Sequence, residues 1–247
     1  MKIYSGFAAL YDALMHDVPY DGWTAQIDKW IHEKFECTKN KIVVDLGCGT
    51  GNVAVRLAKM GYSVIGVDNS ADMLGIAYEK AASAKESILF INQDIRELDL
   101  YGTVDVVVSF CDVMNYMLTD ECLQKVFGRV HLFLNPGGLF IFDMNTAYKY
   151  KDKLGTRVFV GTGTGGEAYV WENKFCGKTM INEYNVRFFD TVNKTMFNEK
   201  HLQKAYDDTV VTDLLKHARF NRVETKCGYT DQNLNAECIR AVYIAQK

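Results

Sequence analysis

The chain has 247 residues, of which 48% are hydrophobic and 24% are charged, and its formal net charge is -3 at pH 7. This composition is typical of a globular protein with a sizeable core, and the lack of a basic surplus counts against a dedicated nucleic-acid-binding protein. No apolar run is long enough to span a bilayer and no apolar signal core precedes the first charges, so we expect a cytoplasmic protein without a membrane partner. The seven cysteines contain no C-x-x-C pair, which argues against zinc and redox motifs and favours reduced thiols.

The N-terminal segment is expected to be helical. Tyr4, Phe7 and Tyr11 repeat at helical spacing, which fits an amphipathic helix packed on the core or, alternatively, a lid whose rings contact a cation. We assign residues 1–40 to an N-terminal helical lid.

From residue 41 the sequence alternates short apolar strands with amphipathic helices. Strands are expected at 41–47, 62–68, 87–94, 104–110 and 139–145, and helices at 52–61, 70–84 and 120–134. This alternation predicts a parallel sheet covered by helices on both faces.

The pattern changes after about residue 147. Three longer, alternating, aromatic-rich segments at 167–175, 179–190 and 195–206 predict an antiparallel meander. A helix at 207–220 and strands at 222–229 and 236–247 then close the chain. The predicted fold is α/β: a doubly wound, mostly parallel, seven-stranded Rossmann-like sheet formed by residues 41–146 and 207–247, with an inserted antiparallel sheet at 147–206.

The stretch VVDLGCGTGN, residues 43 to 52, predicts a ligand-binding turn between the first strand and the following helix. Its glycines do not follow the dinucleotide spacing G-x-G-x-x-G, because position 52 is Asn, which argues against a dehydrogenase. Asp45 would repel a pyrophosphate but attract an ammonium group. Asp68, at the end of the second strand, is placed to bind two ribose hydroxyls. S-adenosylmethionine carries both an ammonium group and a ribose with two free hydroxyls.

Five segments together resemble the class I S-adenosylmethionine-dependent methyltransferases: VVDLGCGTGN, VIGVDNSADML, INQDIREL, DVVVSFCDVMNYM and LNPGGLFIFDMN. The resemblance covers roughly residues 41 to 145 and the closing strands. The segments FAALYDALM and VWENKF are further similar to a bacterial small-molecule branch, laid out like the N-methyltransferases of nucleotide-linked amino sugars. The resemblance implies methyl transfer from S-adenosylmethionine to a nitrogen or oxygen atom of a small-molecule acceptor.

The donor site implied by the resemblance follows the ends of the first four strands. Asp45 and the glycine turn would hold the methionine end, Asp68 the ribose, the segments after the second and third strands the adenine, and the end of the fourth strand the sulfonium. The residues are Asp45, Gly47, Cys48, Gly49, Gly51, Asp68, Asn69, Met73, Gln93, Asp94, Ile95, Phe110 and Cys111.

The acceptor is expected beyond the carboxyl ends of the fourth and fifth strands. The substrate-binding candidates there are Asp112, Asn115 and Asn145, joined by Tyr11 of the N-terminal segment. The methyl group of a sulfonium is already activated, so the enzyme must align the reactants and exclude water, and we expect no metal.

Tyr116 and Asp143 are the catalytic candidates. Tyr116 stands where the amino-sugar enzymes, by resemblance, carry a histidine base, and an ordinary phenol with a pKa of about 10 is a poor base at neutral pH. Tyr116 could instead bind the acceptor or pack under the loop. Asp143 could accept a proton, or its carboxylate could be satisfied by backbone N–H groups. His201, in an alternating strand, is expected on the surface or in the core.

Three other hypotheses for the function remain beside a small-molecule methyltransferase. An RNA methyltransferase or a protein methyltransferase would use the inserted sheet for recognition, although the acidic balance counts against nucleic acid. A sensor would bind S-adenosylmethionine without turnover. The aromatic face of the inserted sheet also leaves open a homodimer.

Overall fold

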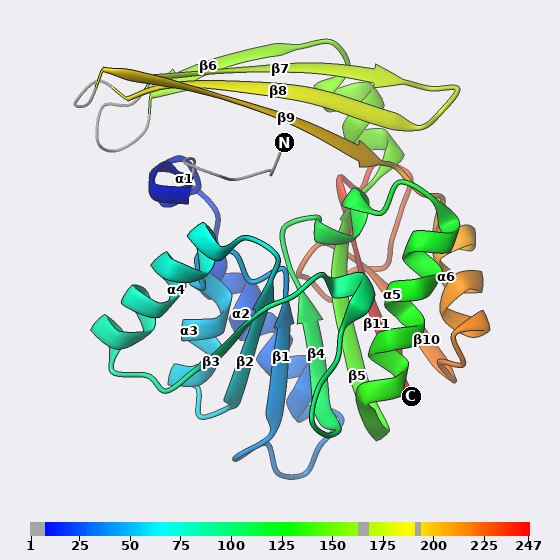
Figure 1. The fold of residues 1–247 in the computed structure, drawn as a ribbon. Helices are drawn as coiled ribbons and strands as arrows, with labels where there is room; N and C mark the ends of the chain where they lie inside the picture. Colours follow the sequence, from blue (N-terminus) through cyan, green and yellow to red (C-terminus); the bar gives the residue numbers. More distant parts are fainter. Residues whose placement is uncertain (1–7, 163–167, 191–193) are drawn as a thin grey trace.

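The computed structural model describes residues 8–162, 168–190 and 194–247, which form two sheets and their flanking helices (Figure 1). The larger sheet has seven strands in the order β10-β11-β5-β4-β1-β2-β3. All neighbouring pairs are parallel except the two made by β11, which confirms the predicted doubly wound, mostly parallel sheet. The strands are β1 Ile42–Leu46, β2 Ser63–Asp68, β3 Leu89–Asn92, β4 Val104–Ser109, β5 Leu134–Asn145, β10 Arg222–Cys227 and β11 Arg240–Gln246.

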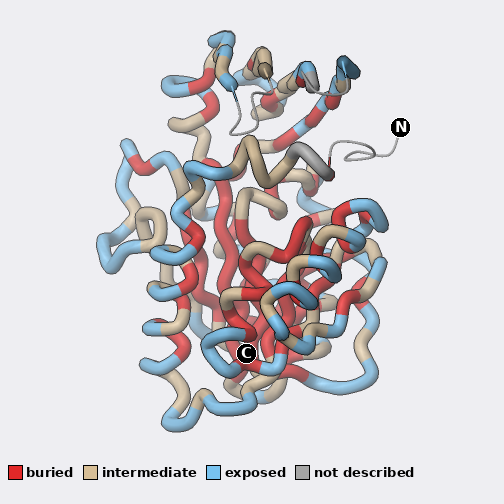
Figure 2. The backbone as a smooth tube through the Cα atoms, turned by 90° about the vertical axis from the view of Figure 1, so that its left-hand side faces the viewer, coloured by how far each residue is buried: buried red, intermediate tan, exposed pale blue. Residues whose placement is uncertain are grey.

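The two faces of the larger sheet bury different residues of the same strand. Along β5, Phe140 and Phe142 pack in one hydrophobic cluster, whereas Leu139 and Ile141 pack in the other, because successive side chains of a strand point to opposite faces. Figure 2 shows the buried residues concentrated on the central strands. Helices α5 (Asp120–Phe133) and α6 (Asp208–His217) cover the first face, and α2 (Tyr20–His32), α3 (Asn52–Lys59) and α4 (Ala71–Ala84) cover the second.

Helix α2 belongs to this core. Its side chains Ile27, Trp30 and Ile31 are buried in the second cluster. Helix α1 (Ala8–Leu14) instead lies between the larger sheet's helices and the smaller sheet (Figure 1). We therefore narrow the proposed lid to the segment around α1. Tyr4 and Phe7, predicted to belong to the same helix, lie outside the described residues.

The smaller sheet is the predicted antiparallel insertion. Its strands are ordered β6-β7-β8-β9, and it lies across the carboxyl edge of the larger sheet (Figure 1). The π-helix at Lys149–Leu154 leads to it from β5. The sequence pattern did not predict this helix or β6, because a short apolar run beside a glycine-rich stretch shows no clear alternation. The strands are β6 Val158–Thr162, β7 Ala168–Cys176, β8 Ile181–Asp190 and β9 Thr195–Lys204.

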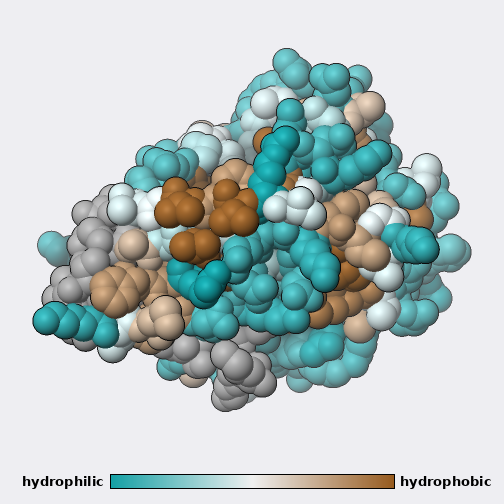
Figure 3. Space-filling model, turned by 90° about the horizontal axis from the view of Figure 1, so that it is seen from above, coloured by the Kyte–Doolittle hydropathy of each residue, from teal (hydrophilic) through white to brown (hydrophobic). Residues whose placement is uncertain are grey.

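Seen from above, the molecule's surface mixes apolar and hydrophilic side chains (Figure 3). Val160, Phe189 and Met196 of the smaller sheet are exposed apolar residues. Ion pairs between neighbouring strands, Arg187 with Glu172 and Lys200 with Glu183, stand beside them. The homodimer stays a prediction.

The cysteines correct one expectation. Cys227 and Cys238 form a disulfide, so the prediction of reduced thiols is wrong for this pair. The two residues flank the connection between the antiparallel strands β10 and β11, whose pairing brings their Cα atoms to 5.6 Å. Their sequence spacing does not show that pairing. Among the described residues, no helix has the length and apolar character needed to cross a membrane.

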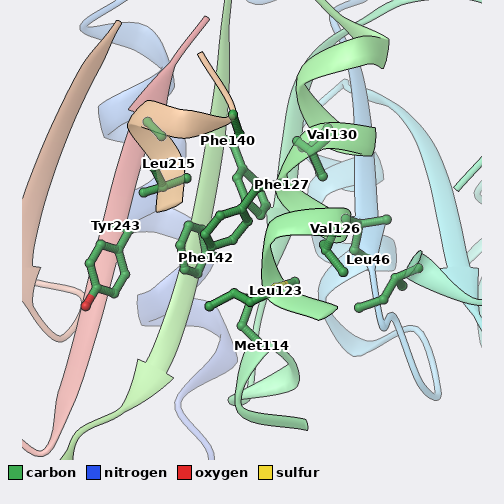
Figure 4. Packing of buried hydrophobic residues seen from close by; sticks show 14 of the residues in the cluster. Leu46, Met114, Leu123, Val126, Phe127, Val130, Phe140, Phe142, Leu215 and Tyr243 are labelled. Atoms are coloured by element: carbon green, nitrogen blue, oxygen red, sulfur yellow. The ribbon is translucent and has the colours of Figure 1, made fainter. Parts of the chain in front are cut away.

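The first prediction concerns the core under α5. Phe127 is fully buried, with its ring centroid 5.9 Å from that of Phe140 and 5.3 Å from that of Phe142 (Figure 4). Phe127→Ala should lower the free energy of unfolding by about 3–5 kcal/mol, because it removes contacts and leaves a cavity. Leu132→Ala, on the same helix but 55% exposed, should change it by less than about 0.5 kcal/mol. Denaturant titration measures both, and equal losses would contradict the assigned packing.

Candidate active site

The turn between β1 and α3 requires glycine. Gly47, Gly49 and Gly51 have φ angles of +71°, +52° and +77°, a region that other residues rarely adopt. A Cβ atom on Gly47 would lie 2.6 Å from Val113. A Cβ atom on Gly49 would meet no atom within 4 Å. The backbone therefore turns sharply and leaves open space beside Gly49.

Asp45 is a buried residue of β1, two residues before Gly47. It is 1% exposed, and its Oδ2 atom has no hydrogen-bond partner among the described residues. Burial, helped by the charge of Asp68, raises the pKa of Asp45 to about 7. A buried carboxylate oxygen without a partner is costly, and it fits a ligand that brings an ammonium group.

Asp68 connects the glycine turn to the start of α4. Its carboxylate accepts hydrogen bonds from the backbone N–H groups of Gly49, at 2.9 Å, and Ser70, at 2.8 Å. Burial raises its pKa, against the effect of these N–H groups. Asp68 faces a cavity of about 300 Å³, which we call the donor cavity.

Most of the predicted donor residues line this cavity. Asp94 does so, but its carboxylate already binds the Arg96 side chain and backbone N–H. The lining residues that were predicted are Gly47, Gly49, Asp68, Asn69, Met73, Asp94, Ile95 and Cys111. Arg96, Val113 and Met117 also line it and were not predicted.

Five predicted donor residues do not line the donor cavity. Asp45 is buried in β1, and Gly51 precedes the first residue of α3. Cys48 is buried. The Gln93 side chain accepts the backbone N–H of Asp99. Phe110 is buried against Tyr229, with ring centroids 5.4 Å apart.

A second cavity, of about 350 Å³, lies beside the donor cavity. The two cavities share Tyr11, Cys111 and Tyr116. We call the second one the acceptor cavity. The smaller sheet supplies one of its walls, through Tyr169, Trp171, Asn182, Tyr184, Val186, Phe188, His201 and Gln203. A ligand in one cavity can therefore meet a ligand in the other at the three shared residues.

Some of the predicted acceptor residues line the acceptor cavity, and Asn115 instead binds a residue that lines it. Tyr11, Asp112, Tyr116 and Asn145 line the acceptor cavity. Asn115 is fully buried and does not line it. Its side chain donates to the carbonyl of Asn145 at 3.1 Å and accepts the Asn145 N–H at 2.8 Å. The geometry gives Asn115 a supporting place.

Asp143 is also buried outside both cavities. Its Oδ1 accepts the N–H of Asp112, at 2.6 Å, and its Oδ2 accepts the N–H of Cys111, at 3.1 Å, and the hydroxyl of Tyr229, at 2.5 Å. Arg240 Nη1 lies 2.8 Å from Oδ2. Cys111 and Asp112 both have positive φ, at +57° and +55°. Asp143 thus holds a strained turn at the junction of the cavities.

Arg240 also binds the side chain of Asp112, with Nη2 3.1 Å from Oδ1. Although burial opposes ionisation, the charges of Arg240 and Lys149 keep the pKa of Asp112 below its ordinary value. Arg240 was not among the predicted site residues. Its signal was a single positive charge at the start of the otherwise apolar strand RAVYIA.

Tyr116 connects the two sheets. Its hydroxyl oxygen lies 2.8 Å from that of Tyr184 and 2.9 Å from Nδ1 of His201. The rings of Tyr184 and His201 are stacked, with centroids 4.6 Å apart. Burial lowers the pKa of His201 to about 4, so its imidazole is neutral at pH 7. His201 is buried, as one expectation had it, but it lines the acceptor cavity.

Asp12 fixes α1 over the glycine turn. Its carboxylate accepts hydrogen bonds from Thr50 Oγ1, at 2.6 Å, and Asn52 Nδ2, at 2.8 Å. Lys80 of α4 forms an ion pair with it at 2.6 Å. The preceding residue of the helix, Tyr11, borders both cavities. These contacts support a lid at α1.

Comparison with known proteins places the chain in a family. The model of a methyltransferase domain matches residues 43–138. "Putative methyltransferase YqeM" of Bacillus subtilis (strain 168) is 32% identical over 249 residues, covering 99% of this chain and 97% of the relative. The crystal structure of an S-adenosylmethionine-dependent methyltransferase from Clostridium acetobutylicum ATCC 824 has a TM-score of 0.87, is 30% identical and covers 98% of both chains.

A more distant structure shares the fold. CalS10 of Micromonospora echinaspora, an amino pentose methyltransferase, has a TM-score of 0.76 at 17% identity, covering 100% of this chain and 98% of its own. The relative that is 32% identical along nearly the whole chain, together with the glycine turn and the buried carboxylates, supports the assignment that the motifs predicted. This chain belongs to the class I S-adenosylmethionine-dependent methyltransferases.

Proposed function

We propose that this enzyme transfers the methyl group of S-adenosylmethionine to a nitrogen or oxygen atom of a small molecule. One observation carries the proposal: the donor and acceptor cavities meet at Tyr11, Cys111 and Tyr116. The acceptor cavity, at about 350 Å³, falls within the range of small-molecule pockets, about 300–1,000 Å³.

The donor residues fit the parts of S-adenosylmethionine. The partnerless oxygen of Asp45 and the open side of Gly49 suit the amino acid end, and Asp68 suits the ribose. Asn69, Met73, Asp94 and Ile95 border the remaining part of the cavity, where the adenine would lie. When bound, S-adenosylmethionine supplies an activated methyl group. The chain's own contribution is to align the acceptor with it and to exclude water.

The acceptor cavity combines aromatic walls with a few charged groups. Its rings come from Tyr11, Tyr116, Tyr169, Trp171, Tyr184 and Phe188, and its charged side chains from Asp112, Lys149 and Arg240. Such walls orient a small polar molecule through shape and a few hydrogen bonds. This lining supports a small acceptor over RNA or protein. The three lining residues that the cavities share, Tyr11, Cys111 and Tyr116, support turnover over a sensor.

We reassign Asp143 from catalysis to positioning. Both of its oxygens are engaged, and it does not border the acceptor cavity. Its carboxylate keeps Cys111 and Asp112 in place at the junction. Tyr116 stays the proposed catalytic residue, because it borders both cavities and its hydroxyl contacts Tyr184 and His201 of the acceptor cavity.

The acceptor can be found with a labelled donor. Incubation of the enzyme with methyl-labelled S-adenosylmethionine and a bacterial metabolite extract should label a small molecule that mass spectrometry then identifies. Parallel incubations with total RNA and with a protein extract test the alternatives. Label in RNA or protein alone would contradict the small-molecule proposal. Light scattering on the same preparation tests the homodimer.

Asp68→Ala should weaken donor binding by about 1.5–3 kcal/mol, or roughly 10- to 150-fold in Kd, because hydrogen bonds to a charged carboxylate are lost. Calorimetry with S-adenosylmethionine measures this change. Asp72→Ala is the matched control, because Asp72 is an exposed residue in the first turn of the adjacent α4. A folded Asp68→Ala variant that binds the donor as tightly as the parent would limit Asp68 to a structural role.

Donor binding should weaken as the pH falls below 7. The pKa of Asp45 is about 7 in the free protein, so at pH 6 the carboxyl must release a proton before it can pair with the donor's ammonium group. The apparent affinity should fall by about fivefold between pH 7 and pH 6, because the ionised fraction of Asp45 falls by that factor. Calorimetry in two buffers of different ionisation enthalpy should detect close to one released proton at pH 6.

Asp45→Asn should remove this proton release, and release that persists in the variant would point to another group. The same pKa shift has a consequence for the free protein. The folded state binds a proton that the unfolded chain loses above its pKa of 3.8. This contribution to stability is present below that value and is lost as the pH rises through about 7.

A further inference from the structure

His201 enters the acceptor cavity from the smaller sheet. It lies directly opposite Tyr184 in the pairing of β9 with β8, so both side chains project from the same face. Tyr116 approaches them from the short 3-10 helix Val113–Tyr116, which follows β4 of the larger sheet. A phenol that borders both cavities thus contacts a histidine supplied by the insertion.

The charges around His201 decide what its ring can do. Its Nδ1 atom, 2.9 Å from the Tyr116 oxygen, accepts the phenol's proton when the ring carries its own hydrogen on Nε2. Burial keeps the ring neutral at pH 7 by lowering its pKa, while Asp112 acts in the opposite direction. Glu199 and Gln203 lie on the same face of β9, and Lys149 and Arg240 border the same cavity.

We propose that His201 is a positioning residue that receives, through Tyr116, the proton that the acceptor loses during methyl transfer. The inference rests on the proposed function and narrows it: the acceptor atom must carry an N–H or O–H bond.

The step balances in atoms and charge. An electron pair of the acceptor atom forms the new bond to the methyl carbon, and the sulfur–methyl bond breaks with its electron pair on sulfur. The acceptor's proton passes to the Tyr116 oxygen as the phenol's own proton passes to Nδ1 of His201. The positive charge of the sulfonium ends on the imidazolium, which later releases a proton to water.

This relay accounts for the tyrosine at a catalytic position. A phenol with an ordinary pKa of about 10 does not lose its proton readily at neutral pH. The phenol can donate its own proton to a neutral nitrogen, here Nδ1 of His201, while its oxygen takes up the proton of the acceptor. Tyr184, with its hydroxyl 2.8 Å from that of Tyr116, is a second hydrogen-bond partner that fixes the position of the phenol's hydroxyl in the acceptor cavity.

The tautomer can be measured without an acceptor. Protein labelled with ¹⁵N-histidine, with His201→Asn used to assign the signal, should show His201 at pH 7 as the neutral ring with hydrogen on Nε2. In Tyr116→Phe the signal of Nδ1 should shift because its hydrogen bond is lost. A His201 ring with hydrogen on Nδ1 would overturn the relay, since that atom would then donate to Tyr116.

The rate test uses the metabolite extract with methyl-labelled S-adenosylmethionine. His201→Asn keeps a hydrogen-bond acceptor near the position of Nδ1 but cannot take up a proton. It should bind the donor within about twofold of the parent, and transfer should slow by roughly 10²- to 10⁴-fold. With the donor at saturating concentration, so that protonation of Asp45 does not limit the rate, the acidic limb that protonation of His201 gives near pH 4 should also be lost. Tyr116→Phe should slow transfer similarly, and the double variant should lose little more.

His32→Asn is the matched control, because this half-exposed histidine lies on α2 and outside both cavities. A His201→Asn variant with the parent's rate and pH profile would overturn the relay alone. A parent enzyme that labels no small molecule in the extract would overturn the proposed function instead.

Discussion

Asp143 holds two consecutive residues in a backbone conformation that neither favours. Positive φ at Cys111 and Asp112 costs on the order of 1–3 kcal/mol for each residue, and such strain persists only where the surroundings fix it. Here one fully buried carboxylate accepts both N–H groups, and Arg240 balances its charge. Cys111 borders both cavities, and so does Tyr116, five residues further along the chain. The junction between the two cavities therefore depends on this interaction.

The two halves of the site differ in how far the sequence predicts them. The donor half is local: Asp45, the glycine turn and Asp68 sit at the ends of two adjacent strands, where ligands of such sheets bind. The acceptor half depends on contacts between distant segments. His201 reaches Tyr116 only through the register of β8 and β9 and the placement of the smaller sheet. A period-two pattern predicts an inward face but not which side chain that face will meet.

Contacts between distant segments also explain why the packing of Tyr229 was not predicted. Tyr229 stacks between Trp23 and Phe110, with ring centroids 4.6 Å and 5.4 Å away. These three rings come from α2, from the end of β4 and from the loop closed by the Cys227–Cys238 disulfide. No motif links segments so far apart in the chain. The strands were predictable because runs such as Leu139 to Phe142 are long and apolar.

The proposed division of the chain into an N-terminal lid, the domain of the larger sheet and the inserted sheet, with boundaries at residues 40, 146 and 206, stays a prediction.

The position of β11 in the sheet affects how the chain can assemble during synthesis. β11 lies between β5 and β10, so β5 leaves the ribosome well before the neighbour that it pairs with on that side. Asp112 and Asp143 likewise emerge long before Arg240, the cation that both of them bind. A growing chain can form the glycine turn early, but Asp112 and Asp143 must wait for the arginine that binds both of them. The donor half of the enzyme can thus take shape before the acceptor half.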